Sequence, residues 1–312
     1  MNLIDMHCDT ILKMMDKDEK FNFKNNNYGI DLSKLKRSNS IAEFFACFVD
    51  LKGDKDPLER ALDMVDKLYL EINKYRETIA IAKSYQDIMT NQKEDKISAI
   101  LTIEGGEALK GKLSNLRNFY KLGVRLITLT WNYQNEIGCP GCVEEFRDKG
   151  LTEFGKELIV EMNKLGMIVD VSHLSDGGFY DAIKYSKKPI VASHSNAREV
   201  KHHSRNLTDP MIKLLGENGG VMGLNFCNPF LSKEKVATVE DMVSHIKHIV
   251  NVGGIDVAAI GTDFDGIDNP PEVKHIGEMH KLVDALHKHG FSELDIEKIF
   301  YKNTLRVIKE NL

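Results

Sequence analysis

The sequence predicts a closed barrel of eight parallel strands ringed by helices, a TIM-type (β/α)8 fold, and three observations support this prediction. The 312 residues suit one such barrel, which commonly takes about 250 residues or more. Eight short apolar segments alternate with longer amphipathic ones. The apolar segments lack the polar alternation of half-exposed strands, as expected for parallel strands buried on both faces. We therefore expect residues 1–312 to form a single barrel domain.

The expected strands occur at intervals along the whole chain. They are NLID near residue 3, AEFFACFV near 45, ISAILTI near 100, VRLITLT near 127, MIVDVS near 169, PIVAS near 191, GVMGLNF near 223 and VAAIGTD near 260. Helical patterns include PLERALDMVDKLYLEINKYRETI, TEFGKELIVEMNKLG and VEDMVSHIKHIVNVGG, and the last two end in glycine, as helices often do. The polar segment 16–36 is expected to be a surface loop or small insertion. The alternative, a doubly wound open sheet, usually has a glycine-rich turn after its first strand, and DMHCDT is not such a turn.

Composition excludes several classes of function. A hydrophobic fraction of 42%, a charged fraction of 29% and a formal net charge of −5 describe an ordinary globular protein without the basic excess that binds nucleic acid. We find no apolar run of about 18 residues and no secretory signal, so we expect a cytoplasmic protein that does not bind membranes. Five cysteines, an odd number, favour reduced thiols. Cys47 is expected in the core, and Cys139 and Cys142 of CPGC in a surface turn rather than a redox pair.

Imidazole and carboxylate side chains stand at the ends of five of the expected strands. They are His7 and Asp9 after the first strand, Glu104 after the third, His173 after the fifth, His194 after the sixth and Asp263 after the eighth. In a barrel, the carboxyl ends of all strands meet on one face, where the active site is built. These six side chains are therefore predicted to converge on a metal site.

The number of these groups predicts two metal ions, because one catalytic zinc needs only three protein ligands. We expect His7 and Asp9 on one ion and His173 and His194 on the other. Glu104 would bridge ions roughly 3.5–4 Å apart. Nitrogen and oxygen ligands suit zinc, although they leave manganese, cobalt or iron open.

This metal site predicts a hydrolase. A water held between two such ions becomes a nucleophile near neutral pH, which suits hydrolysis of a carbonyl or phosphoryl compound. Asp263 is placed to act as general base and then general acid. Asp265, two residues on, shares that strand face if the strand continues, so it remains an alternative for this role.

The ordered motifs H-x-D, EGG, DVSH, SHS, RNLTD and G-x-DFDG resemble those of the membrane (renal) dipeptidase family of binuclear zinc peptidases, from residue 3 to about residue 310. The resemblance implies a bacterial-type cytoplasmic member with an amidohydrolase-like barrel, and a homodimer. It implies two zinc ions held by His7 and Asp9, by the bridging Glu104, and by His173 and His194. It also implies that Asp263 handles the proton and that Arg205 binds the C-terminal carboxylate of a dipeptide.

Arg205 has a physical argument of its own, because a planar guanidinium binds a carboxylate bidentately and so selects short substrates. One position departs from the family pattern. Renal-type members have a histidine after TLT at the end of the fourth strand, where it contacts the substrate and helps to stabilise the tetrahedral intermediate, and this chain has Trp131. An indole donates one hydrogen bond and carries no charge. Loss of an oxyanion donor would cost about a hundredfold in rate, unless the zinc ions or a neighbour such as Asn132 compensate.

The sequence thus predicts a metal-dependent dipeptidase for small dipeptides, including those with a C-terminal D-residue. The alternative is a binuclear amidohydrolase that acts on another small amide, a cyclic amide or a lactone. A third hypothesis, suggested by Trp131, is a catalytically silent barrel that binds a ligand or a partner. The remaining histidines are expected to be structural or solvated: His202, His203, His245, His248, His275, His280, His287 and His289.

Overall fold

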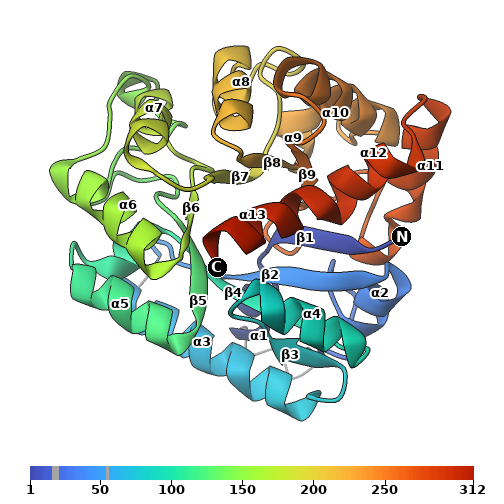
Figure 1. The fold of residues 1–312 in the computed structure, drawn as a ribbon, viewed down its shortest axis with the longest axis horizontal. Helices are drawn as coiled ribbons and strands as arrows, with labels where there is room; N and C mark the ends of the chain where they lie inside the picture. The colour runs from blue at the N-terminus through green and yellow to red at the C-terminus, as the bar shows by residue number, and fades with distance from the viewer. Residues whose placement is uncertain (16–20, 54–55) are drawn as a thin grey trace.

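Strands from the whole length of the chain form one closed parallel sheet, which confirms the predicted barrel (Figure 1). The structure is a computed structural model that describes residues 1–15, 21–53 and 56–312. Its strands are β1 Leu3–Cys8, β2 Ser40–Phe48, β3 Ile79–Ile81, β4 Ile97–Glu104, β5 Val124–Thr128, β6 Ile168–Asp170, β7 Val191–Ser195, β8 Val221–Leu224 and β9 Ala258–Ile260. Pairing of β2 with β4 and of β1 with β9 closes the ring. All eight expected strands are present in it.

The short strand β3 was not expected, and it lies outside the ring. β2 pairs with β4 along residues 98–104, β3 pairs with β4 at residues 97–99, and β5 pairs with β4 at residues 101–104. β3 and β5 therefore share the edge of β4 that β2 leaves free. The predicted helix from residue 57 to 79 was too long, because α3 ends at Lys74 and Ile79 begins β3. Three residues are too few to show the alternation that identifies a strand.

Most of the helices surround the ring of strands, and α13 lies across one end of it (Figure 1). They are α1 Thr10–Met15, α2 Leu32–Arg37, α3 Pro57–Lys74, α4 Tyr85–Lys93, α5 Leu113–Leu122, α6 Glu153–Leu165, α7 Asp176–Tyr185, α8 Asp209–Glu217, α9 Asn228–Leu231, α10 Val239–Gly253, α11 His280–Lys288, α12 Glu293–Glu297 and α13 Asn303–Asn311. The predicted glycine stop of α6 is confirmed, since Gly166 is left-handed with φ 76°. Thr238 and Asp241 form a capping box at the start of α10.

The segment 16–36 was expected to be a surface loop or small insertion, and its described residues 21–36 pack partly against the core. Residues 16–20 lie outside the described residues. In the rest of the segment, Phe23 and Ile30 are buried against the main core, and Asp31 caps α2 by accepting from the backbone N–H of Lys34. This connection therefore packs as part of the barrel's outer layer.

Two apolar clusters stabilise the fold. The larger cluster fills the space between the strands and the outer helices. The smaller one lies inside the barrel and includes Ile4, Phe44, Ile100 and Leu126 together with residues of α13. Figure 1 shows α13 lying across the ring of strands, so this helix closes the N-terminal end of the barrel. The active site must therefore open at the other end.

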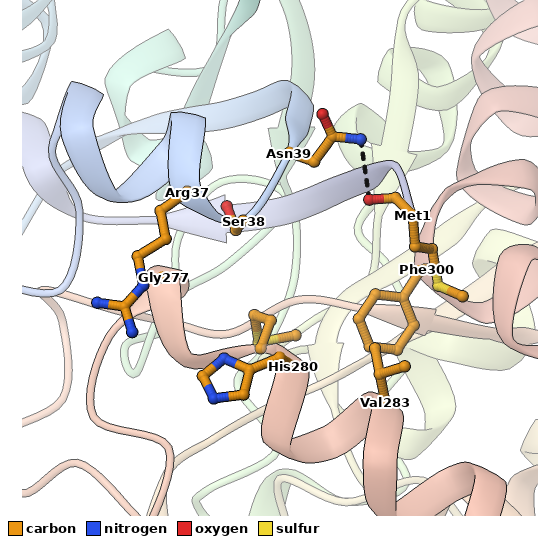
Figure 2. Close-up of a pocket in the computed structure, with 9 residues that line it drawn as sticks. Met1, Arg37, Ser38, Asn39, Gly277, His280, Val283 and Phe300 are labelled. Carbon is orange, nitrogen blue, oxygen red and sulfur yellow. Dashed lines mark hydrogen bonds between the residues drawn. The ribbon is translucent and has the colours of Figure 1, made fainter.

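A cavity of about 220 Å³ lies near the starts of β1 and β2 (Figure 2). Met1, Arg37, His280 and Phe300 contribute to its lining, and the side chain of Asn39 donates a 3.0 Å hydrogen bond to the Met1 carbonyl beside it. None of the expected site residues lines this cavity, in keeping with its position at the N-terminal end of the strands.

The five cysteines are free thiols, as expected. Cys47 is buried in the core, Cys139 is buried and Cys142 is exposed. The CPGC segment is therefore a turn that is only partly on the surface. Among the helices of the described residues, we find none with the length and apolarity needed to cross a membrane.

Two glycines allow β8 and the segment after β9 to approach the backbone of β7 closely. A Cβ at Gly223 would lie 2.0 Å from the carbonyl oxygen of Ser193, and a Cβ at Gly261 would lie 1.7 Å from the same atom. The backbones of β8 and the segment after β9 therefore leave room for the Ser193 carbonyl, which no side chain at these positions would permit. His194 follows Ser193 directly, so this contact helps to determine where β7 presents that histidine.

We predict that Gly261→Ala destabilises the protein by about 3 kcal/mol, because backbone atoms rather than a flexible side chain occupy the space of the new methyl group. Denaturant-induced unfolding measures this change. Gly53→Ala is the matched control, since its Cβ would meet only the Asp50 side chain, and we expect a change within about 0.5 kcal/mol. Wild-type stability in Gly261→Ala would contradict the proposed packing constraint.

Candidate active site

The structure brings the six predicted strand-end side chains together at the C-terminal end of the barrel. Three overlapping groups of possible ligand atoms each lie within 4.8 Å: His7, Asp9 and Glu104; Glu104, His173 and His194; and His7, His194 and Asp263. Glu104, His7 and His194 each belong to two of these groups. The distances around Glu104 can therefore be compared with the predicted assignment of His7 and Asp9 to one ion and of His173 and His194 to the other.

The two oxygens of Glu104 face different partners. Oε1 lies 3.0 Å from Nε2 of His173 and 3.5 Å from Nε2 of His194. Oε2 lies 3.4 Å from Nε2 of His7, and Oδ2 of Asp9 lies 3.4 Å from the same nitrogen. The Nε2 atoms of His173 and His194 are 3.0 Å apart. One side of Glu104 thus faces a pair of histidines, and the other side faces His7 and Asp9.

Hydrogen bonds orient both histidines of the pair. Nδ1 of His194 lies 2.8 Å from Oγ of Ser193, whose hydroxyl donates a 2.6 Å bond to Oδ2 of Asp170. The hydroxyl proton is then engaged, so His194 donates from Nδ1 and keeps a lone pair on Nε2. Nδ1 of His173 lies 3.0 Å from Oδ1 of Asn132, which gives the same tautomer. Such partners are typical of histidines that bind a metal.

The structure distinguishes the positions of Asp263 and Asp265. Oδ1 of Asp263 lies 3.8 Å from Nε2 of His7, inside the site. The carboxylate of Asp265 instead accepts a 2.7 Å bond from the hydroxyl of Thr10 and a 2.6 Å bond from the backbone N–H of Gly29. Asp265 therefore holds a neighbouring loop, whereas Asp263 lies among the clustered side chains.

Left-handed backbone places several of these side chains. His173, Asp263 and Asp265 have φ values of 67°, 64° and 70°. This conformation is uncommon outside glycine, and such residues cluster at functional sites. The following turn is equally restricted, because a Cβ at Gly266 would lie 2.1 Å from Oδ2 of Asp9 and 2.8 Å from Oδ1 of Asp263. Two carboxylates can converge there only because residue 266 is glycine.

Burial and crowding of like charges perturb the acids of the site. Burial raises the pKa of Asp9, and the neighbouring Glu104 raises it further. Burial also raises the pKa of Asp263 to about 8, against the lowering effect of His7. Burial alone would raise the pKa of Glu104, but the three surrounding histidines hold it well below its usual range.

Burial and neighbouring charges also shift the pKa values of the three histidines, in different directions. Burial lowers the pKa of His173 to about 4 and holds that of His194 well below its usual range, so both are neutral and able to bind a cation. Burial would also lower the pKa of His7, but the carboxylates of Glu104 and Asp9 raise it well above its usual range. The site therefore concentrates negative charge around His7.

Unpaired buried atoms fit a bound cation. Both ring nitrogens of His7 and Oδ1 of Asp9 have no hydrogen-bond partner among the residues that the structure describes. Buried polar groups normally have partners, and unpaired ones indicate an unseen water or ion. Imidazole nitrogens with carboxylate oxygens are ligands that suit zinc and related divalent ions. The residues present therefore fit the divalent metal that the sequence predicts.

Arg205 lies beside this cluster with unused donors. The residue is 5% exposed, and one of its terminal nitrogens donates a 3.2 Å bond to the carbonyl of His194. Nε has no partner within the described part of the chain, and the guanidinium lies 5.6 Å from the ring centre of Phe230. Arg198 stabilises the loop that carries Arg205, through a bidentate 2.7 Å pair with Asp176. A fixed, buried guanidinium of this kind suits an anionic group of a ligand.

Trp131 is part of an aromatic cluster at the edge of the site. Its ring centre lies 4.8 Å from that of Phe48, 5.5 Å from that of Tyr133 and 6.3 Å from that of His173. Trp131 is thus near the ligands, whereas the side chain of its neighbour Asn132 contacts His173.

Two of the other histidines have structural contacts, as expected. His245 is buried, with Nδ1 accepting from the backbone of Ala197 and Nε2 beside the carbonyl of Leu231. Nδ1 of His203 accepts from the backbone N–H of Arg205.

Sequence reasoning missed two buried polar residues that support the site. Asp170 accepts four hydrogen bonds, two from backbone N–H groups and two from hydroxyls, directly below His194. Asn225 donates a 2.9 Å bond to Oδ2 of Asp263. A signal was present, because both are polar residues within apolar strand segments, DVS and GLNF.

Comparisons with known proteins agree with this geometry. The sequence pattern of the membrane dipeptidase family (peptidase family M19) matches residues 1–311. A dipeptidase of Schizosaccharomyces pombe, itself uncharacterized, is 33% identical over 299 residues, which cover 90% of this chain and 71% of that protein. Dipeptidase tcpJ of Claviceps purpurea is 31% identical over 294 residues, covering 90% and 69%.

Solved structures of metallopeptidases are similar to this chain over nearly its whole length. A metallopeptidase of Rhodobacter sphaeroides, solved with a phosphinate mimic of the dipeptide L-Ala-D-Ala, has a TM-score of 0.92 at 25% identity and covers 100% of this chain and 99% of its own. A dipeptidase of family M19 has a TM-score of 0.91 at 25% identity, covering 99% and 98%. Because the family pattern spans nearly the whole chain and two relatives above 30% identity are named dipeptidases, the chain belongs to the membrane dipeptidase family of metallopeptidases.

Proposed function

We propose that this dipeptidase cleaves the peptide bond of small dipeptides, including those with a C-terminal D-residue, with two divalent cations, most suitably zinc. The observation that carries the proposal is the position of Glu104, whose two oxygens face two separate sets of possible ligands. His7 and Asp9 would hold one cation, His173 and His194 the other, and Glu104 would bridge them. Such a pair of cations, when bound, polarises a carbonyl and lowers the pKa of water.

The other residues of the site would bind the substrate, transfer the proton and orient the metal ligands. Arg205 would bind the free carboxylate of the dipeptide through its unused donors. Asp263, with Oδ1 directed towards His7, would take a proton from the attacking water and deliver it to the leaving amine. Asn132 would keep His173 in the tautomer that binds a cation. Trp131, Phe48 and Tyr133 would form an apolar wall beside the substrate.

The phosphinate mimic of L-Ala-D-Ala in the Rhodobacter sphaeroides relative supports a dipeptide with a C-terminal D-residue as one substrate. L-Ala-D-Ala and L-Ala-L-Ala are therefore the first substrates to compare.

We expect the metal-free protein to bind two zinc equivalents per chain, and zinc-dependent hydrolysis of L-Ala-D-Ala to stop when a chelator is added. Glu104→Gln removes the shared negative charge without changing the shape of the side chain. It should lower metal content below two equivalents and lower kcat/KM by at least about a hundredfold, because both cations lose a ligand. Elemental analysis and a dipeptide assay measure the two effects.

Glu43→Gln is the matched control for this experiment. Glu43 is a fully buried glutamate of β2 that belongs to none of the possible ligand groups of the site. We expect two zinc equivalents in this variant. Binding of a single equivalent to the wild-type protein would argue against the proposed pair of cations.

Arg205→Met should raise the KM for dipeptides by about a hundredfold while two metal equivalents are retained, because a buried charge-assisted pair is lost. Arg205→Lys should recover little of this loss, since a lysine lacks the planar fork. Steady-state kinetics with L-Ala-D-Ala and with its C-terminal amide measure the dependence on a free carboxylate. Equal rates of wild type and Arg205→Met would instead favour the alternative, an amidohydrolase for another small amide, a cyclic amide or a lactone.

Trp131→His should raise kcat for dipeptides by about tenfold or more, because an imidazole supplies the charged donor that an indole lacks. Trp131→Phe keeps an aromatic ring against Phe48 and should not raise kcat. A lower kcat in Trp131→His than in the wild type would mean that the indole itself contributes to turnover.

A further inference from the structure

Asn225 holds the carboxylate of Asp263, the residue that handles the proton in the proposed function. Asn225 follows β8 and is fully buried. Its Nδ2 donates a 2.9 Å hydrogen bond to Oδ2 of Asp263. Oδ1 of Asp263 is left on the side of His7, 3.8 Å from Nε2. The two oxygens of one carboxylate thus have separate environments.

The orientation of the Asn225 amide follows from its other contacts. Its Oδ1 accepts a 2.6 Å hydrogen bond from the backbone N–H of Cys227. An amide oxygen accepts and an amide nitrogen donates, so the nitrogen must point in the opposite direction, towards Asp263. The flipped amide would place an oxygen against a carboxylate and a nitrogen against an N–H group.

A second asparagine fixes the backbone of Asn225. The N–H of Asn225 donates to Oδ1 of Asn196 at 3.0 Å, and Nδ2 of Asn196 donates to the carbonyl of Asn225 at 2.9 Å. Asn196 is also fully buried and follows β7. This reciprocal pair joins the ends of β7 and β8, so Asn225 cannot move away from Asp263 without breaking buried hydrogen bonds.

The backbone of Asp263 is fixed as well, which leaves its side chain as the part that can move. Its N–H donates to the carbonyl of His7 at 3.1 Å, its carbonyl accepts from the N–H of Gly266 at 3.2 Å, and its φ is 64°. The hydrogen bond from Asn225 holds Oδ2 of the Asp263 carboxylate from the side away from His7. Without it, the carboxylate could rotate about its side-chain torsions.

We propose that Asn225 is a positioning residue, which holds the Asp263 carboxylate so that Oδ1 faces the side where the substrate and the attacking water meet. This inference rests on the proposed function for the role of Asp263. Asn225 acts through Asp263 and does not itself touch the substrate. A misplacement of about 1 Å in a catalytic group is enough to cost about a hundredfold in rate.

Kinetics of a double-mutant cycle test the proposal. Asn225→Ala should lower kcat for L-Ala-D-Ala by about tenfold to a hundredfold with KM changed less than about threefold and two zinc equivalents retained. In the Asp263→Asn background, the same substitution should change kcat by less than about twofold, since the residue through which it acts is gone. Equal losses in both backgrounds, or loss of a zinc equivalent, would overturn the proposal in favour of a general structural role.

Asn311→Ala is the matched control for the loss of a buried asparagine. Its side chain donates to the carbonyls of Pro189 and Val307 at 3.1 Å each, at the N-terminal end of the barrel. We expect Asn311→Ala to lower the midpoint of thermal unfolding while kcat stays within about twofold of the wild type.

A crystal structure of zinc-loaded Asn225→Ala tests the positioning without reference to any substrate. The Asp263 carboxylate should leave its wild-type position or occupy more than one rotamer, and an unchanged single position would refute the proposal. If the wild-type protein fails to hydrolyse any dipeptide but the carboxylate moves in Asn225→Ala, the proposed function fails and the positioning role stands.

Discussion

The close approach of three backbone segments inside the barrel is the constraint on which the site depends. Gly223 on β8, which pairs with β7, and Gly261 after β9 leave space for the carbonyl of Ser193, so these three segments come closer together at the end of β7 than side chains would allow. The next residue along β7 is His194, and its ring centre lies 3.8 Å from that of His7 on β1. Two strands that are not neighbours in the sheet thus contribute imidazoles to one cluster.

Buried hydrogen bonds between neighbouring strands fix the positions of the side chains in this cluster. Asp5 accepts from both the backbone N–H and the hydroxyl of Thr262, which joins β1 to the segment after β9. Asp170 of β6 likewise accepts from both the backbone N–H and the hydroxyl of Ser193 on β7. This hydroxyl is the group that orients His194. Each carboxylate links neighbouring strands just before a proposed ligand. The ligands are therefore positioned by groups that are themselves buried and satisfied, as in other preorganised sites.

The sequence alone predicted the barrel and the convergence of its strand-end side chains, because both follow from local patterns. An apolar run followed by His7, Glu104 or His194 is visible without knowledge of the fold, and the barrel brings such ends together. The choice between Asp263 and Asp265 was not predictable in this way. Strand alternation placed both on one face, but β9 ends at Ile260 and both residues have left-handed backbone, so the alternation no longer applies. The sequence marked Asn225 and Asp170 only as polar residues within apolar segments, and it could not show their contacts with Asp263 and Ser193, which lie 38 and 23 residues away.

Closure of the inner core by α13 has a consequence for biosynthesis. β1 is translated before the other strands of the barrel but pairs with β9, some 250 residues later, and its inner side packs against α13, which follows all of these strands. The interior of the barrel is therefore incomplete while the strands emerge from the ribosome. During that interval β1 presents an unpaired apolar edge, the kind of surface that promotes aggregation. Folding of such a chain is expected to be slow and dominated by contacts between its two ends, and its yield in cells should depend on protection of the early strands.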